Sequence, residues 1–144
     1  MNRWQPSCVV VKPEWELQSK KDMKTMASTI LVIEDHASVR TLLAQVLKDA
    51  GYQVCEAATG REGLERFREQ PMDLVITDLE MPEMTGLEVI LALTRTFLDV
   101  KVIAMSGHSA DELQKARLMG ARQTFAKPLD LPALLNAVQY ELQH

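Results

Sequence analysis

This sequence of 144 residues has little cysteine, no long apolar run and no excess of positive charge. Its two cysteines, Cys8 and Cys55, match no metal-binding or redox spacing, so we expect both to be reduced. No apolar stretch approaches the roughly 20 residues that cross a bilayer, and the first residues lack the apolar core of a signal peptide. The net charge of −4 offers no basic surface to nucleic acid. These absences predict a cytoplasmic protein without membrane insertion or direct nucleic-acid binding.

The composition, 47% hydrophobic and 25% charged, is typical of a globular protein, and the length suits one domain. Residues 1–28 differ from the rest because they show no sustained apolar period, although they contain Trp4 and Trp15. We expect this segment to be a disordered or non-native extension and residues 29–144 to form the domain. The alternative is a tail that docks to a partner through the two tryptophans.

Strand-like and helix-like segments alternate five times from Thr29 onward. Short apolar runs predict the strands, and apolar residues at helical spacing predict the helices. The expected strands are Thr29–Ile33, Gln53–Ala57, Asp73–Thr77, Lys101–Met105 and Gln123–Ala126. The expected helices are Ala37–Ala50, Gly60–Gln70, Gly86–Phe97 with Leu87, Ile90 and Leu91 inward, one from a capping box at Ser109–Glu112 to Gly120, and one after Asp130.

Five such units with right-handed crossovers predict an α/β fold with a doubly wound, five-stranded parallel sheet. In the strand order 2-1-3-4-5, the first, third and fifth strands bracket one crevice at their carboxyl ends. Ligands of open α/β sheets bind at this position.

Charged residues follow these three strands directly. Glu34 and Asp35 follow the first, Asp78 follows the third and Lys127 follows the fifth. Three carboxylates beside one ammonium make a poor structural ion pair but suit a divalent cation and a phosphoryl group.

With these motifs the chain resembles the receiver domain of two-component response regulators, a flavodoxin-like fold, and in extent the stand-alone chemotaxis type. The resemblance covers Thr29 to about Leu142. It rests on four motifs in order: Glu34-Asp35, Asp78-Leu79-Glu80-Met81-Pro82-Glu83-Met84-Thr85-Gly86, Ser106, and Lys127-Pro128.

The resemblance implies that Asp78 accepts a phosphoryl group from phosphohistidine. Glu34 and Asp35, together with Asp78 and the backbone carbonyl of Glu80, would hold Mg²⁺, a cation that prefers oxygen ligands. Lys127 would contact the phosphoryl group. The domain would assist its own phosphorylation and dephosphorylation as a signalling domain rather than act as an enzyme.

Ser106 is the implied switch, since its hydroxyl could donate to a phosphoryl oxygen. Family members couple this contact to an aromatic residue three positions before the lysine. Here that position is Thr124, and its neighbour Phe125 faces the other side of the strand. The aromatic relay is therefore altered in this chain.

Glu80 and His108 occupy the positions that tune the lifetime of the phosphorylated state in the family. Three further residues are expected to be structural, with a cis bond between Lys127 and its proline: Pro82, Gly86 and Pro128.

The expected partners are a sensor histidine kinase or a histidine phosphotransfer protein, and a downstream protein that docks on the last two helices and the strand between them. With no output domain expected after the last helix, the chain would act by docking or by relaying phosphate. The alternative is a phosphorylation-independent pseudo-receiver, favoured by Thr124. The third alternative is a flavin carrier or an aspartyl-phosphate phosphatase on the same fold, but this sequence lacks the motifs of both.

Overall fold

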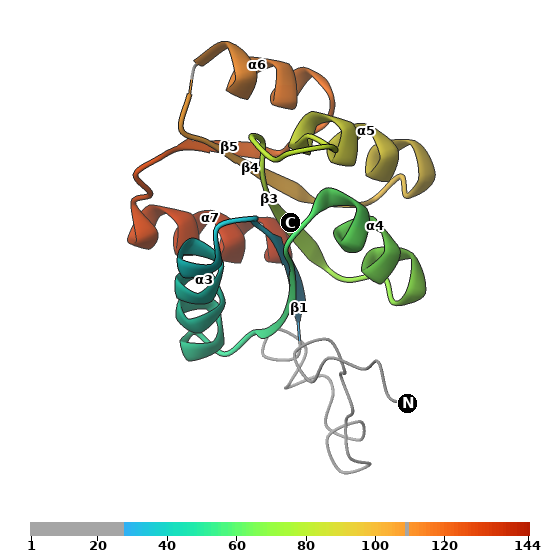
Figure 1. Ribbon diagram of the computed structural model, residues 1–144. Helices are drawn as coiled ribbons and strands as arrows, with labels where there is room; N and C mark the ends of the chain where they lie inside the picture. Colours follow the sequence, from blue (N-terminus) through green and yellow to red (C-terminus); the bar gives the residue numbers. More distant parts are fainter. Residues whose placement is uncertain (1–27, 109) are drawn as a thin grey trace.

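The computed structural model describes residues 28–108 and 110–144 (Figure 1). These residues form a five-stranded parallel sheet in the order β2-β1-β3-β4-β5, which confirms the predicted fold and strand order. The strands are β1 (Thr29–Ile33), β2 (Gln53–Ala57), β3 (Leu74–Asp78), β4 (Val102–Ser106) and β5 (Gln123–Ala126).

Five helices cover the two faces of this sheet, as Figure 1 shows. They are α3 (Ala37–Asp49), α4 (Gly60–Glu69), α5 (Gly86–Thr96), α6 (Ala110–Leu118) and α7 (Leu131–Gln143). One apolar core lies between the sheet and α4, α5 and α6, and a second lies between the sheet and α3 and α7. Every residue of β1, β3 and β4 is buried, because central parallel strands are covered on both faces.

Local signals in the sequence explain where the helices begin and end. The Thr59 and Asp130 side chains each accept a hydrogen bond from an amide of the first turn of α4 and α7. Thr85 and Glu88 form a reciprocal capping box at the start of α5. After α3 the chain turns at Gly51, whose φ of 101° is strained for other residues.

The predicted helix and strand boundaries are correct to within about two residues, and the predicted inward face of α5 is correct in part. Ile90 is buried and Leu87 packs against the core, as predicted, whereas Leu91 is only partly buried and the prediction missed the buried Val89 and Leu93.

Some expectations fall outside the described residues, namely the extension before Ser28 and the capping box that begins at Ser109. The expectation of reduced cysteines is wrong for Cys55, which is disulfide-bonded. Among the described helices, none is long and apolar enough to span a membrane.

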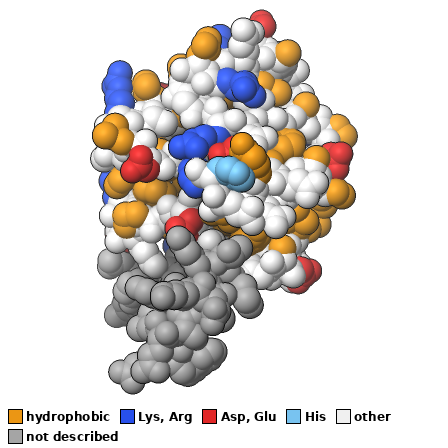
Figure 2. Space-filling view, turned by 180° about the vertical axis from the view of Figure 1, so that it is seen from behind, with side chains coloured by type: hydrophobic (Ala, Val, Ile, Leu, Met, Phe, Trp, Pro, Cys, Tyr) orange, Lys and Arg blue, Asp and Glu red, His pale blue; other side chains and the backbone are white. Residues whose placement is uncertain are grey.

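The two rims of the sheet differ in character. The carboxyl-end rim carries Glu34, Asp78 and Ser106, all buried. At the opposite rim, Thr29 donates its amide to the Asp73 carboxylate (2.8 Å), and Leu98, in the loop between α5 and β4, is 88% exposed. On the face in Figure 2, basic side chains lie in small groups among acidic and apolar ones, so its described residues offer no continuous basic surface.

Gly86 allows α5 to begin against the end of β3. A Cβ at this position would lie 2.2 Å from the Asp78 carbonyl oxygen and 2.7 Å from Leu79 Cα, and both are backbone atoms that cannot turn away. We expect Gly86→Ala to lower the free energy of unfolding by about 1–3 kcal/mol, measured by urea denaturation. Gly107→Ala is the control, because its nearest contacts are ordinary at 3.8 Å. Equal stability of the two variants would contradict the prediction.

Candidate functional site

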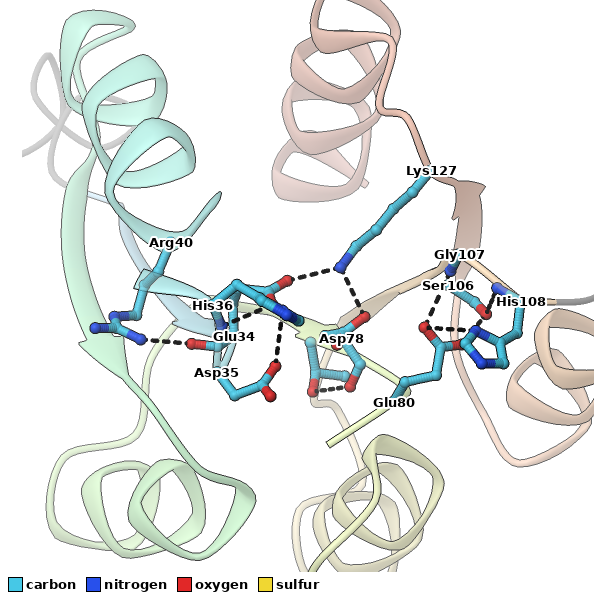
Figure 3. A network of polar contacts seen from close by, with 11 residues as sticks. Glu34, Asp35, His36, Arg40, Asp78, Glu80, Ser106, Gly107, His108 and Lys127 are labelled. Carbon is cyan, nitrogen blue, oxygen red and sulfur yellow. Dashed lines mark hydrogen bonds and ion pairs between the residues drawn. The ribbon is translucent and has the colours of Figure 1, made fainter. Parts of the chain in front are cut away.

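A single ammonium group joins the ends of three strands. Lys127 follows β5, and its Nζ lies 3.0 Å from Glu34 Oε1, after β1, and 3.0 Å from Asp78 Oδ1, at the end of β3 (Figure 3). Glu34 and Asp78 are buried, at 0% and 1% exposure. The predicted convergence of these three side chains on one rim is what the structure shows.

The second oxygen of Glu34 is also engaged. Glu34 Oε2 accepts a hydrogen bond from the His36 amide (3.1 Å) and lies 3.2 Å from His36 Nδ1, while Arg40 donates to the Glu34 backbone carbonyl (2.7 Å). Glu34 is therefore held by partners on every side. The sequence analysis missed His36 and Arg40; the only available signal was their position just after the acidic pair and one turn further along.

Two buried carboxylate oxygens at this rim lie beside a basic side chain. They are Asp35 Oδ1, which lies 3.3 Å from His36 Nδ1, and Asp78 Oδ1, which lies 3.0 Å from Lys127 Nζ. Glu34, Asp35 and His36 also place one ligand atom each within 4.8 Å of one another. Oxygen atoms of this kind suit a hard divalent cation such as Mg²⁺, so the residues fit the cation that the resemblance implies.

The electrostatics of the rim favour a protonated lysine and a weakly acidic Asp78. Burial raises the pKa of Asp78 to about 6, a rise that Lys127 opposes and the Glu34 charge reinforces. Burial alone would lower the pKa of Lys127, but its contacts with Glu34 and Asp78 raise it above its usual value. The lysine thus remains charged between two carboxylates.

A second polar cluster lies on the other side of Asp78. Ser106, the last residue of β4, donates its hydroxyl to Glu80 Oε2, and the Gly107 amide donates to Glu80 Oε1 (3.0 Å). The His108 amide donates to Ser106 Oγ (3.1 Å), and His108 Nδ1 lies 3.8 Å from Glu80 Oε1. Burial alone would raise the pKa of Glu80, but these hydrogen bonds and the nearby charges lower it.

The three residues expected to be structural lie in the loops around the two clusters. The Lys127–Pro128 bond is cis, and the Lys127 amide donates to the Ser106 carbonyl (2.8 Å), which ties the start of this loop to β4. Pro82 lies in the exposed part of the loop after Asp78, and Gly86 is buried where that loop ends.

The altered switch position lies on β5. Phe125 packs against the core beneath α3 and α7, and adjacent residues of a strand face opposite sides, so Thr124 faces the α6 side. The aromatic ring of Phe125 therefore lies on the side of β5 that faces away from α6, as expected from the sequence.

The raised pKa of Asp78 predicts how stability depends on pH in metal-free buffer. The ordinary value of 3.8 rises to about 6 on folding, so the folded protein binds the proton more tightly and this stabilisation disappears as pH rises from 4 to above 6. We expect Asp78→Asn to be about 1–3 kcal/mol more stable than the unmodified protein at pH 7.5, with the difference shrinking towards pH 4. Urea denaturation with EDTA measures this, and a difference independent of pH would contradict it.

Comparisons with known proteins agree with this geometry. The family described as the response regulator receiver domain matches residues 30–139. The sporulation initiation phosphotransferase F of Bacillus subtilis is 32% identical over 115 residues, which cover 79% of this chain and 93% of that protein. The autoinducer sensor kinase/phosphatase CqsS of Vibrio cholerae is 35% identical over 113 residues, 76% of this chain but only 16% of that protein.

Among solved structures, the response regulator TrrA of Thermotoga maritima in complex with Mg²⁺-BeF superposes with a TM-score of 0.74 at 31% identity. The match covers 79% of this chain and 98% of that one. With the family match over most of the chain, the parallel sheet in the order β2-β1-β3-β4-β5 and the acidic rim beside a lysine, the chain belongs to the response regulator receiver domains of two-component signalling.

Proposed function

We propose that Asp78 accepts a phosphoryl group from a sensor histidine kinase or a histidine phosphotransfer protein, with Mg²⁺ as cofactor. The observation that carries this proposal is the buried Asp78 carboxylate, whose Oδ1 lies 3.0 Å from the Lys127 ammonium. The carboxylate can act as a nucleophile, and the adjacent cation stabilises negative charge that arrives there.

In the transfer, the phosphorus–nitrogen bond of a phosphohistidine breaks while an oxygen–phosphorus bond to Asp78 forms, and the imidazole nitrogen keeps the leaving electron pair. With a pKa of about 6, Asp78 is mainly ionised at neutral pH and can attack. The Lys127 ammonium would move its contact from the Asp78 carboxylate to the phosphoryl oxygens, which carry the negative charge after transfer. Glu34 contacts the same ammonium group from the other side, at 3.0 Å.

Asp35, Asp78 and the Glu80 backbone carbonyl would hold Mg²⁺ directly, and Glu34 would hold it through a water molecule. When bound, this ion would neutralise the charge that accumulates as a phosphoryl group joins the carboxylates. The chain's own residues position the reacting oxygen and keep the lysine protonated, so the cation adds charge neutralisation to a rim that is already organised.

The phosphorylated domain would act on a downstream protein through the face of α6, β5 and α7, in the cytoplasm and as a signalling domain rather than an enzyme. Support comes from exposed apolar side chains on two of these elements, since Leu118 at the end of α6 is 81% exposed and Tyr140 on α7 is 53% exposed. The match to a sensor kinase and to a phosphotransferase supports partners that handle phosphohistidine. The folded unit of this proposal is residues 29–144.

A phosphorylation-independent interaction module remains the second candidate, because Thr124 replaces the expected aromatic residue. In that case the α6–β5–α7 face would bind its partner without any change at Asp78. The two functions differ in one chemical property, which is whether Asp78 forms an acyl phosphate.

Incubation with acetyl phosphate and Mg²⁺ should add one phosphoryl group to the protein. We expect intact-protein mass spectrometry to show the adduct, hydroxylamine to remove it, and EDTA or Asp78→Asn to prevent it. Lys127→Met should reduce the rate at least about tenfold, since a buried charge partner is lost. Asp130→Asn, a remote cap, is the control, and an unmodified protein under all conditions would favour the interaction module.

Ser106→Ala should separate phosphorylation from the conformational response. The variant keeps Asp78, Lys127 and the acids, so we expect the adduct to form at a rate within about threefold of the unmodified protein. Amide chemical-shift changes in α6, β5 and α7 on phosphorylation should shrink by more than about half, because the hydroxyl can no longer draw the loop towards a phosphoryl oxygen. Ser106→Thr keeps the hydroxyl and serves as the control. An undiminished response in the alanine variant would contradict the role of Ser106.

A further inference from the structure

The hydroxyl and amide donors at the end of β4 already have an anionic ligand, and it belongs to the chain itself. Ser106 Oγ donates to one oxygen of Glu80, and the Gly107 amide donates to the other at 3.0 Å (Figure 3). Ser106 Oγ also accepts the His108 amide, so its single hydrogen is directed at Glu80. The Glu80 carboxylate is thus bound through both oxygens.

We propose that Glu80 is an internal ligand of the Ser106–Gly107 anion site and competes with a phosphoryl group on Asp78 for these two donors. The inference rests on the proposed function of Asp78 and adds the regulation of the same site. In the unphosphorylated protein, the Glu80 carboxylate holds the loop after β4; phosphorylation releases Glu80 and takes over its donors.

The topology places the contested donors beside Asp78. β3 and β4 are neighbours in the sheet, and Asp78 pairs with Met105, the residue before Ser106. Neighbouring strands lie about 4.8 Å apart, so a phosphoryl group on the end of β3 comes within reach of a hydroxyl at the end of β4. Lys127 lies on the other side of Asp78 and is not contested, because its partners are Glu34 and Asp78.

The competition follows from the number of hydrogens available. A serine hydroxyl and a backbone amide each have one hydrogen to donate, so neither can serve two anions fully. Glu80 also carries a carboxylate, which a nearby phosphoryl group would repel. Two effects therefore separate Glu80 from the site when phosphate arrives. A glutamate with only a structural role at the loop would not alter the affinity for a phosphoryl group.

Beryllofluoride with Mg²⁺, an analogue of a phosphoryl group on a carboxylate, tests the competition in the full chain. We expect Glu80→Ala to bind beryllofluoride about tenfold more tightly than the unmodified protein, as measured by titration followed with amide and fluorine NMR. In the absence of beryllofluoride and Mg²⁺, we expect hydrogen exchange of the Gly107 amide to become at least about fivefold faster in this variant, because its acceptor is gone.

Glu83→Gln is the matched control, since it removes one exposed negative charge from the same loop. It should leave both the beryllofluoride affinity and Gly107 exchange within about twofold of the unmodified protein. A similar gain of affinity in this control would attribute the effect to charge alone and overturn the proposal.

The failures of the two proposals are distinguishable. If beryllofluoride binds the unmodified protein and Glu80→Ala equally well, or Gly107 exchange is the same in both, only the competition by Glu80 is overturned. If beryllofluoride binds neither protein, the proposed function of Asp78 fails and the inference that rests on it fails too.

Discussion

The ion pair that Lys127 makes with two buried carboxylates is the interaction on which the rest of the site depends. Its Nζ joins the ends of β1, β3 and β5 at 3.0 Å to Glu34 and 3.0 Å to Asp78. A buried carboxylate without a cationic partner is strongly destabilising, so neither acid could stay buried and ionised alone. Because β1 and β3 are adjacent while β5 lies at the edge, one long side chain must span β4 to link them. The parallel strand order and the lysine's length are therefore parts of one constraint.

Asp78 separates two kinds of polar environment along this rim. On the β1 side lie carboxylates and a histidine, which suit a cation. On the β4 side lie a hydroxyl and a backbone amide, which suit an anion and are bound by Glu80. A group attached to Asp78 meets both environments at once, and this explains how a chemical change on one buried side chain can reach the loop before α6.

The sequence predicted the strands, their order and the convergence of Glu34, Asp78 and Lys127, because apolar runs and strand-end charges are local signals that the sheet brings together. It could not predict the Glu80–Ser106 contact, which joins residues 26 positions apart through side-chain rotamers. On α5 the sequence predicted the buried Ile90 but missed Val89 and Leu93. These features arise from packing between elements, for which periodicity within one element gives no signal.

The separation of the two rims has a practical consequence for biophysical work. Leu98 lies in solvent at the end of the molecule where β4 begins, and Ser106 lies where β4 ends. The five residues of β4 that separate the two ends span about 17 Å. A fluorophore or spin label introduced at Leu98 would therefore lie in the loop before β4, at the end of the sheet away from the acids. Such a reporter could follow binding at the chemical end without taking part in it.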